Sequence, residues 1–204
     1  MLDKNPELSV DDMTKIQIQF KQKNPNIILC LKPFHKTEFL NRLINTIENS
    51  IIIVDMDLLY TGYVQSGMIQ KKENVMIFYP DKSDWKKRLT DIISKVSKER
   101  FLIIIDSFNG VYNLFDELES ARLINSCIML LSSIGNQTKS SVIITGMARK
   151  KDDEWVLSPG GKHIITSENT GVYFLKKIQN DLVITTLEKT DANSSKFIIK
   201  QENI

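Results

Sequence analysis

Cysteine, histidine and long apolar runs are scarce in this 204-residue chain, and each scarcity argues against a class of protein. The two cysteines, Cys30 and Cys127, are far apart and form no CxxC pair, so the sequence predicts neither a disulfide framework nor a zinc site. The two histidines, His35 and His163, belong to no set of metal-ligating residues. No apolar run approaches the ~20 residues that span a bilayer, so we expect no membrane contact.

The chain also has no large excess of positive or negative residues. Its formal net charge of +2 is too small to indicate nucleic-acid binding by itself, so only a local basic patch would indicate it. The first ten residues, MLDKNPELSV, are acidic and polar and resemble neither a signal peptide nor a transit peptide. Without a disulfide framework, these features predict a cytoplasmic protein.

Short apolar runs are abundant, and the most prominent is FLIIIDSF at residues 101–108. An unbroken run of this length is typical of a strand covered on both faces, as in a parallel sheet. Similar runs lie at residues 26–31, 50–57, 74–79 and 141–146. Apolar residues at helical spacing lie between them, at residues 37–47, 83–96 and 114–134. This alternation predicts one α/β domain with right-handed crossovers and a mostly parallel sheet.

Both ends of the chain depart from the alternating pattern. Three further strands, at residues 171–177, 181–189 and 195–201, are joined by short polar turns and predict an antiparallel extension. A polar loop at 148–159 and a short helix near 162–166 precede them. At the other end we expect a helix from Val10 that is capped by Ser9. Residues 1–25 are therefore predicted to form an N-terminal appendage on a main domain of residues 26–204.

The turn after the first predicted strand carries an altered phosphate-binding loop. Segment 30–37, CLKPFHKT, has the place and length of G-x-x-x-x-G-K-[ST], and Lys36 and Thr37 match its last two positions. Cys30 and His35 replace the two glycines, and Pro33 removes a backbone N–H. Because the motif binds phosphate through backbone N–H groups that need glycine torsions, we expect this cradle to be damaged. The alternative is an ordinary helix start, with Thr37 as N-cap and Lys36 in solvent.

Aspartates end two of the predicted strands. Asp106 ends the central run and would hold Mg²⁺ together with Thr37 where a nucleotide binds. Asp55 and Asp57 end the strand at 50–57, and Asp57 has the place of an acid that orients an attacking water. Aspartate is one methylene shorter than glutamate, so its reach is reduced. The alternative is that Asp55 and Asp57 cap the segment that follows.

The order of these parts resembles the RecA-like ATPase domain, and in particular the archaeal RadA/RadB recombinase branch. The tail is the most specific part of the likeness: Gly160-Gly161, TGVYFLKK, LEKT and KFIIKQENI, with Asn203 in place of the glycine of F-x-I-x-x-x-G-I. The likeness covers about residues 26–204. KaiC-like proteins and the ATPase-like accessory subunits of Elongator share this fold. The resemblance implies a RecA-like three-layer sandwich, with helices on both faces of the sheet and antiparallel C-terminal strands.

The same resemblance assigns roles to the residues already singled out. Lys36 and Thr37 match the phosphate-loop pair, Asp106 matches the magnesium-associated aspartate of the Walker B strand, and Asp57 falls on the catalytic glutamate. Met147 falls where the family usually has a polar sensing residue, often glutamine. The F-x-x-A tether of filament assembly is not evident near the N-terminus. The resemblance therefore implies a paralogue with a degenerate Walker A loop and weak or no ATP hydrolysis.

The polar loop at 148–159 has the position of the family's second DNA-binding loop. Its candidate contacts to phosphates and bases are Arg149, Lys150, Lys151 and Trp155, with Lys162 just beyond. The acidic run at 152–154 cancels the local charge, so a solvated loop without DNA is the alternative.

Three functions follow from these observations. The first is an accessory protein of DNA recombination and repair that binds single-stranded DNA or a RecA-family recombinase, within a homo- or hetero-oligomer. The second is a working, DNA-dependent ATPase with ATP and Mg²⁺ as cofactors. The third is a purely structural subunit of a hetero-oligomer. The missing catalytic parts favour the first function over the second.

Overall fold

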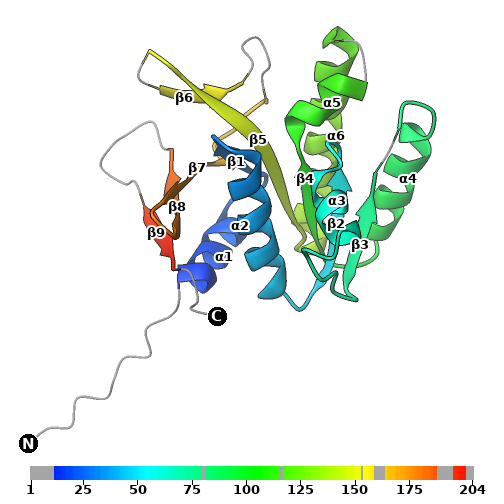
Figure 1. Ribbon diagram of the computed structural model, residues 1–204. Helices are drawn as coiled ribbons and strands as arrows, with labels where there is room; N and C mark the ends of the chain where they lie inside the picture. Colours follow the sequence, from blue (N-terminus) through cyan, green and yellow to red (C-terminus); the bar gives the residue numbers. More distant parts are fainter. Residues whose placement is uncertain are drawn as a thin grey trace, which may run out of the picture.

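The computed structural model describes residues 12–79, 81–114, 117–152, 154–158, 164–187 and 195–200, with only the backbone at 112–114 and 117–121. Helices and strands alternate through most of this part of the chain (Figure 1). The helices are α1 (Asp12–Gln22), α2 (Pro33–Asn45), α3 (Leu59–Gln65), α4 (Trp85–Val96), α5 (Phe108–Leu114) and α6 (Glu117–Thr138). The strands are β1 (Asn26–Cys30), β2 (Ser50–Asp55), β3 (Val75–Phe78), β4 (Phe101–Asp106), β5 (Ser141–Lys151), β6 (Glu154–Leu157), β7 (Gly171–Ile178), β8 (Asp181–Thr186) and β9 (Lys196–Ile199).

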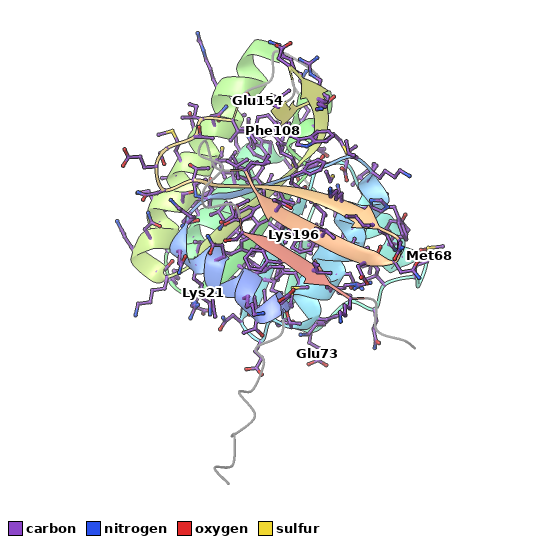
Figure 2. The ribbon with its side chains drawn as sticks, turned by 90° about the vertical axis from the view of Figure 1, so that its left-hand side faces the viewer. Lys21, Met68, Glu73, Phe108, Glu154 and Lys196 are labelled. Carbon is purple, nitrogen blue, oxygen red and sulfur yellow. The ribbon has the colours of Figure 1, made fainter. Side chains whose placement is uncertain are left out.

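The strands form one sheet in the order β3-β2-β4-β5-β1-β7-β8-β9, with β6 paired to β5 outside this path. The neighbours from β3 to β7 are parallel, whereas β8 and β9 are antiparallel additions (Figure 2). This arrangement confirms the predicted α/β architecture, with its mostly parallel sheet and antiparallel C-terminal strands. The central strands are continuous apolar runs because both of their faces are covered.

Two apolar layers lie on opposite faces of the sheet, and β2 shows how they are divided. Ile51 and Ile53 face the layer that contains α1, α2 and α3. Ile52 and Val54 face the layer that contains α4, α5 and α6. The helices therefore cover both faces, as Figure 1 shows, and the carboxyl ends of β1, β2, β4 and β5 meet at one edge. No helix among the described residues is long and apolar enough to cross a membrane.

The start of the described chain is part of the core. Met13, Ile16 and Phe20 of α1 are buried in the layer on its side of the sheet. The division at residue 25 into an appendage and a main domain stays a prediction, and Ser9 and Val10 lie outside the described residues.

A single buried amide joins this helix to the sheet. Asn26, at the start of β1, donates from Nδ2 to the carbonyl oxygens of Phe20 and Lys23, both at 2.9 Å. Its Oδ1 accepts from the hydroxyl of Tyr173 on β7 at 3.2 Å. Since the Asn26 side chain is fully buried, no water can replace these bonds without a rearrangement.

The helix predicted at 114–134 is α6, at Glu117–Thr138, and a separate helix, α5, precedes it. Two other expectations about local structure are wrong. Ser83 does not cap α4: the N-cap is Asp84, and the Asp81 carboxylate accepts from the N–H groups of Ser83 and Asp84. The helix near 162–166 is absent from the described residues 164–166, and the rest of it lies outside the described part.

Replacement of Asn26 by alanine tests the contribution of this amide. We expect a loss of about 2–3 kcal/mol in the free energy of unfolding, because a buried carbonyl, a partly buried carbonyl and a hydroxyl each lose a hydrogen bond. Urea denaturation followed by circular dichroism measures it. Asn49→Ala, at an exposed asparagine before β2, is the matched control and should change stability by less than about 0.5 kcal/mol. Equal effects in the two variants would contradict the proposed role of Asn26.

Candidate functional site

The first strand-to-helix connection is shorter than predicted. Helix α2 begins at Pro33 and not at Thr37, so only Leu31 and Lys32 separate it from β1. Proline is well suited to the first helical turn, because its fixed φ matches the helix and its missing N–H has no intrahelical partner there. Thr37 is therefore not an N-cap, and its hydroxyl donates to the carbonyl of Pro33 at 3.2 Å. The backbone that would surround a phosphate is part of a helix.

Lys36 is buried at the carboxyl edge of the sheet and not in solvent. Its Nζ lies 2.6 Å from Oδ1 of Asp106 and 2.9 Å from Oδ2 of Asp57. The Lys36 side chain is 2% exposed and that of Asp106 is 0% exposed, whereas that of Asp57 is 27% exposed. The structure thus brings together three of the predicted site residues, from α2, the end of β4 and the segment after β2.

The charges of this group shift one another's titration. Burial raises the pKa of Asp106 to about 6, and the nearby Lys36 opposes that rise. Burial alone would lower the pKa of Lys36, but the carboxylates of Asp106 and Asp57 outweigh it and the pKa is raised. Burial likewise works to raise the pKa of Asp57, and Lys36 reverses the shift so that this pKa is lowered. At neutral pH the group therefore contains one ammonium and two carboxylates.

The oxygens of Asp57 are turned toward the protein. Oδ2 accepts from Lys36 and from the Ser107 hydroxyl, both at 2.9 Å, and Oδ1 accepts from the Leu59 N–H at 3.2 Å. Strand β2 ends at Asp55, so Asp57 lies beyond the strand and not at its end. A carboxylate that accepts three hydrogen bonds and has a lowered pKa is a weak general base.

Polar side chains from β5 and α5 complete this edge of the sheet. The Thr145 hydroxyl donates to Oδ1 of Asp106, which also accepts from Lys36. Met147 has its N–H bonded to Oδ1 of Asn109 at 2.7 Å, and its sulfur lies 3.8 Å from that of Cys30. An apolar side chain therefore occupies the place of the expected polar sensor. Asn109 also donates to the carbonyl of Ser158 and so holds the base of the next hairpin.

The predicted loop at 148–159 is a β-hairpin where it is described. Strand β5 continues to Lys151 and pairs with β6 in antiparallel register. Lys150 lies opposite Trp155, and Arg149 and Lys151 lie opposite Val156 and Glu154. Because successive side chains of a strand point to opposite faces, the three basic residues do not share one face. Lys151 also lies opposite an acid, which reduces its attraction for phosphate.

Trp155 is engaged in the fold. Its ring stacks on that of Phe174 in β7, with centroids 4.1 Å apart and planes 14° from parallel. One face of the indole is therefore unavailable to a base. Lys162 lies outside the described residues, so its contact with DNA stays a prediction.

Three residues of the site were not assigned a role from sequence: Ser107, Asn109 and Thr145. Asp55, for which capping of the following segment was the alternative, is buried, and its Oδ2 accepts from the Thr61 N–H at 2.6 Å. Burial raises its pKa. The signal for Ser107 was its position directly after β4, whereas Thr145 lies inside β5, level with Asp106 at the end of β4. No local sequence pattern predicts a role for Asn109, because its hydrogen-bond partners, Met147 and Ser158, lie far from it along the chain.

Replacement of Lys36 by methionine tests the buried group. The loss of the ammonium leaves Asp57 and Asp106 as uncompensated neighbouring charges, so we expect about 3–5 kcal/mol lower stability at pH 7.5. The deficit should shrink as the pH falls toward about 6, because the loss of Lys36 raises the pKa of Asp106 further and protonation of this carboxyl group removes the repulsion. Chemical denaturation at several pH values measures both effects.

The double variant Lys36→Met/Asp106→Asn is the control for this prediction. It removes one positive and one negative charge, so it should be more stable than Lys36→Met alone by at least about 1 kcal/mol. Additive losses would show that Lys36 and Asp106 do not interact in the folded protein.

Known proteins resemble the chain in fold and not in sequence. No protein-family model matches it, and no curated protein matches it in sequence. One ATPase domain of known structure matches with a TM-score of 0.57 at 10% identity, over 89% of this chain and 86% of that domain. A DnaB-like replicative helicase, whose structure was solved to describe its interactions with primase, matches with a TM-score of 0.57 at 10% identity.

That helicase match covers 90% of this chain, which spans 58% of the helicase chain. The RadB recombinase matches with a TM-score of 0.54 at 13% identity, over 88% of this chain and 93% of that chain. At such low identity these likenesses concern the fold alone, and they agree with the sheet order and the layers described above. The chain has the RecA-like fold of P-loop ATPase domains.

Proposed function

We propose that this protein is a RecA-like accessory protein of DNA recombination or repair that has little or no ATPase activity. It acts by binding single-stranded DNA or a RecA-family partner within a homo- or hetero-oligomer. One observation carries this proposal: the Lys36 ammonium is bound between Asp57 and Asp106, with its side chain 2% exposed. The charge that would meet a phosphate is already neutralised inside the protein.

The backbone near Lys36 supports the same conclusion. A phosphate nest needs several free N–H groups that converge on one point. Pro33 has no N–H, and that of Lys36 already bonds to the carbonyl of Lys32 at 3.4 Å. A triphosphate would have to unwind the first turn of α2 and also separate Lys36 from its carboxylates. Breaking a buried ion pair costs about 3–5 kcal/mol, which a ligand has to supply from its own contacts.

The surface around the closed site supports a protein partner. Leu31, Phe34 and Leu58 are 44%, 56% and 57% exposed, and they come from the two segments that flank Lys36 and Asp57. The Phe34 ring also contacts Tyr63 of α3, with centroids 6.3 Å apart. We infer that these exposed apolar side chains contribute to an interaction surface.

The hairpin supports a second, weaker site for single-stranded DNA. Arg149, Lys150 and Lys151 are all exposed, and the hairpin extends from the carboxyl edge of the sheet (Figure 1). Since these residues are divided between two faces, a strand of DNA would contact the edge of the hairpin and not a flat basic surface. We therefore expect weak binding that depends mainly on charge.

A calorimetric titration of the protein with ATP and Mg²⁺ is the decisive experiment. We expect no saturable heat at ATP concentrations up to about 1 mM, because Lys36 and the first turn of α2 are unavailable. The Lys36→Met variant should give the same flat titration. Saturable binding to the natural protein that disappears in the variant would instead identify a working nucleotide site and refute this proposal.

A fluorescence titration with labelled single-stranded DNA tests the hairpin. Neutralisation of Arg149, Lys150 and Lys151 to glutamine should weaken binding and lower the slope of log affinity against log salt by up to about 2. The matched control changes three exposed lysines near α4 to glutamine, and these are Lys82, Lys86 and Lys87. Because both variants lose three charges, equal losses would indicate a non-specific field and not a site on the hairpin.

A further inference from the structure

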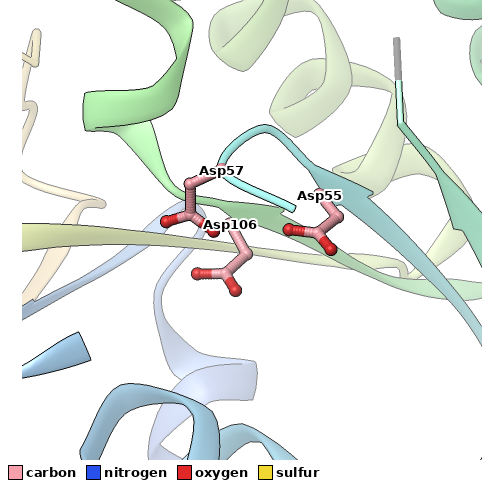
Figure 3. A group of neighbouring side chains, drawn as sticks. All are labelled: Asp55, Asp57 and Asp106. Atoms are coloured by element: carbon pink, nitrogen blue, oxygen red, sulfur yellow. The ribbon is translucent and has the colours of Figure 1, made fainter. Parts of the chain in front are cut away.

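Three carboxylates gather at the carboxyl edge of the sheet, and they form a feature that does not depend on nucleotide binding. Asp55, Asp57 and Asp106 each place an oxygen within 4.8 Å of the others (Figure 3). Asp55 and Asp106 are paired in register at the ends of β2 and β4. Asp57 follows two residues after the end of β2 and turns back toward them. The neighbouring parallel strands thus bring three like charges together.

Two of these carboxylates are buried and have an oxygen without a partner. Asp55 is 1% exposed and Asp106 is 0% exposed. Among the described residues, Oδ1 of Asp55 and Oδ2 of Asp106 have no hydrogen-bond donor. Buried carboxylate oxygens are almost always paired, because an unpaired one loses its hydration without compensation. Both oxygens therefore indicate a missing ligand that binds anionic oxygen.

The charge of the group defines the kind of ligand. With all three carboxyl groups ionised beside one ammonium, the group has two unbalanced negative charges, and two of its three carboxyl groups are buried. A water molecule would donate hydrogen bonds but would leave this charge unchanged. A divalent cation would both satisfy the free oxygens and neutralise the remaining charge.

We propose that Asp55, Asp57 and Asp106 bind one divalent cation of the Mg²⁺, Mn²⁺ or Ca²⁺ class in the absence of any nucleotide. All donors are oxygens, which hard cations prefer. Ligand oxygens at about 2.0–2.6 Å from an ion lie up to about 5 Å apart, so the observed span suits one shared ion. The partly exposed side chain of Asp57 provides access from solvent, and waters complete the coordination.

This site differs from that of a nucleotide-associated magnesium ion. It uses Asp55, and it does not use Thr37, whose hydroxyl is turned to the carbonyl of Pro33. The ion would hold the end of β2 to the end of β4. Further along the chain, the Ser107 hydroxyl bonds to Asp57 and Asn109 holds the hairpin, so ion binding would stiffen this whole edge.

Electron paramagnetic resonance of Mn²⁺, titrated into nucleotide-free protein, tests the proposal directly. We expect one ion per chain, and a melting temperature that rises with the concentration of Mn²⁺ or Ca²⁺. Asp55→Asn should weaken binding at least about tenfold, since it removes a ligand charge but keeps an acceptor for the Thr61 N–H. Asp152→Asn, at an exposed turn with a φ of 47° that asparagine tolerates, is the matched control and should bind as the natural protein does.

A second variant keeps the proposal testable if Asp55→Asn does not fold. Lys36→Gln removes the competing positive charge, so its affinity for Mn²⁺ should rise at least about tenfold by Coulomb attraction. The ion should also recover part of the melting temperature that this variant loses. Absence of saturable binding to the natural protein at millimolar Mn²⁺ overturns the proposal, and so does unchanged affinity in both variants.

Repeating the titration with ATP separates this proposal from the proposed function. Mn²⁺ that binds only when ATP is present overturns the nucleotide-free site and also contradicts a closed nucleotide site. No Mn²⁺ binding in either condition overturns the cation site alone, and the proposed function stands.

Discussion

The buried ammonium of Lys36 fixes the arrangement of the whole carboxyl edge of the sheet. A lysine side chain that is 2% exposed is stable as a cation only beside carboxylates, and Asp106 and Asp57 lie at 2.6 and 2.9 Å. These contacts hold the start of α2 against the ends of β2 and β4, which come from three separate stretches of the chain. In a phosphate-binding loop the lysine ammonium faces a ligand, whereas the ammonium of Lys36 forms ion pairs with Asp57 and Asp106 of the protein. The charges of Asp57 and Asp106 are both opposed by this one cation.

The early start of α2 makes these ion pairs possible. With only Leu31 and Lys32 between β1 and Pro33, the connection is too short to wrap around a phosphate group. Residues 33–36 form the first turn of α2 and not a loop. This turn places Lys36 beside Asp106 at the end of β4. Pro33 and the absence of glycine at positions 30 and 35 therefore act in the same direction. They stabilise a helix where the RecA-like fold can also hold a cradle.

The strands were predictable because their signal is local. FLIIID in β4 and SIIIVD in β2 are buried on both faces, so burial alone dictates an unbroken apolar run. The start of α2 was not predictable in the same way. KPFH has no Ser, Thr, Asp or Asn as a cap, and Pro33 was interpreted as part of a turn although it opens the helix. The hairpin of β5 and β6 was not predicted because its apolar and charged residues are grouped, as in RKK and WVL, and do not alternate. The pairing of Lys36 depends on how α2 rotates over the sheet, and sequence spacing does not specify that rotation.

The presence of Lys36 and Asp106 is therefore no argument for nucleotide use in this chain. Each charged member of the group is stable only while the others are present, so a loss of Lys36 or Asp106 alone leaves an uncompensated buried charge. The ion pairs between Lys36 and the two carboxylates explain the presence of these residues as fully as a catalytic role does. The group still has three carboxyl groups beside one ammonium, and two of the carboxyl oxygens have no hydrogen-bond donor among the described residues. The three carboxyl groups at the ends of β2 and β4 can therefore be understood without a nucleotide, from the charges and free oxygens that they bring to one edge of the sheet.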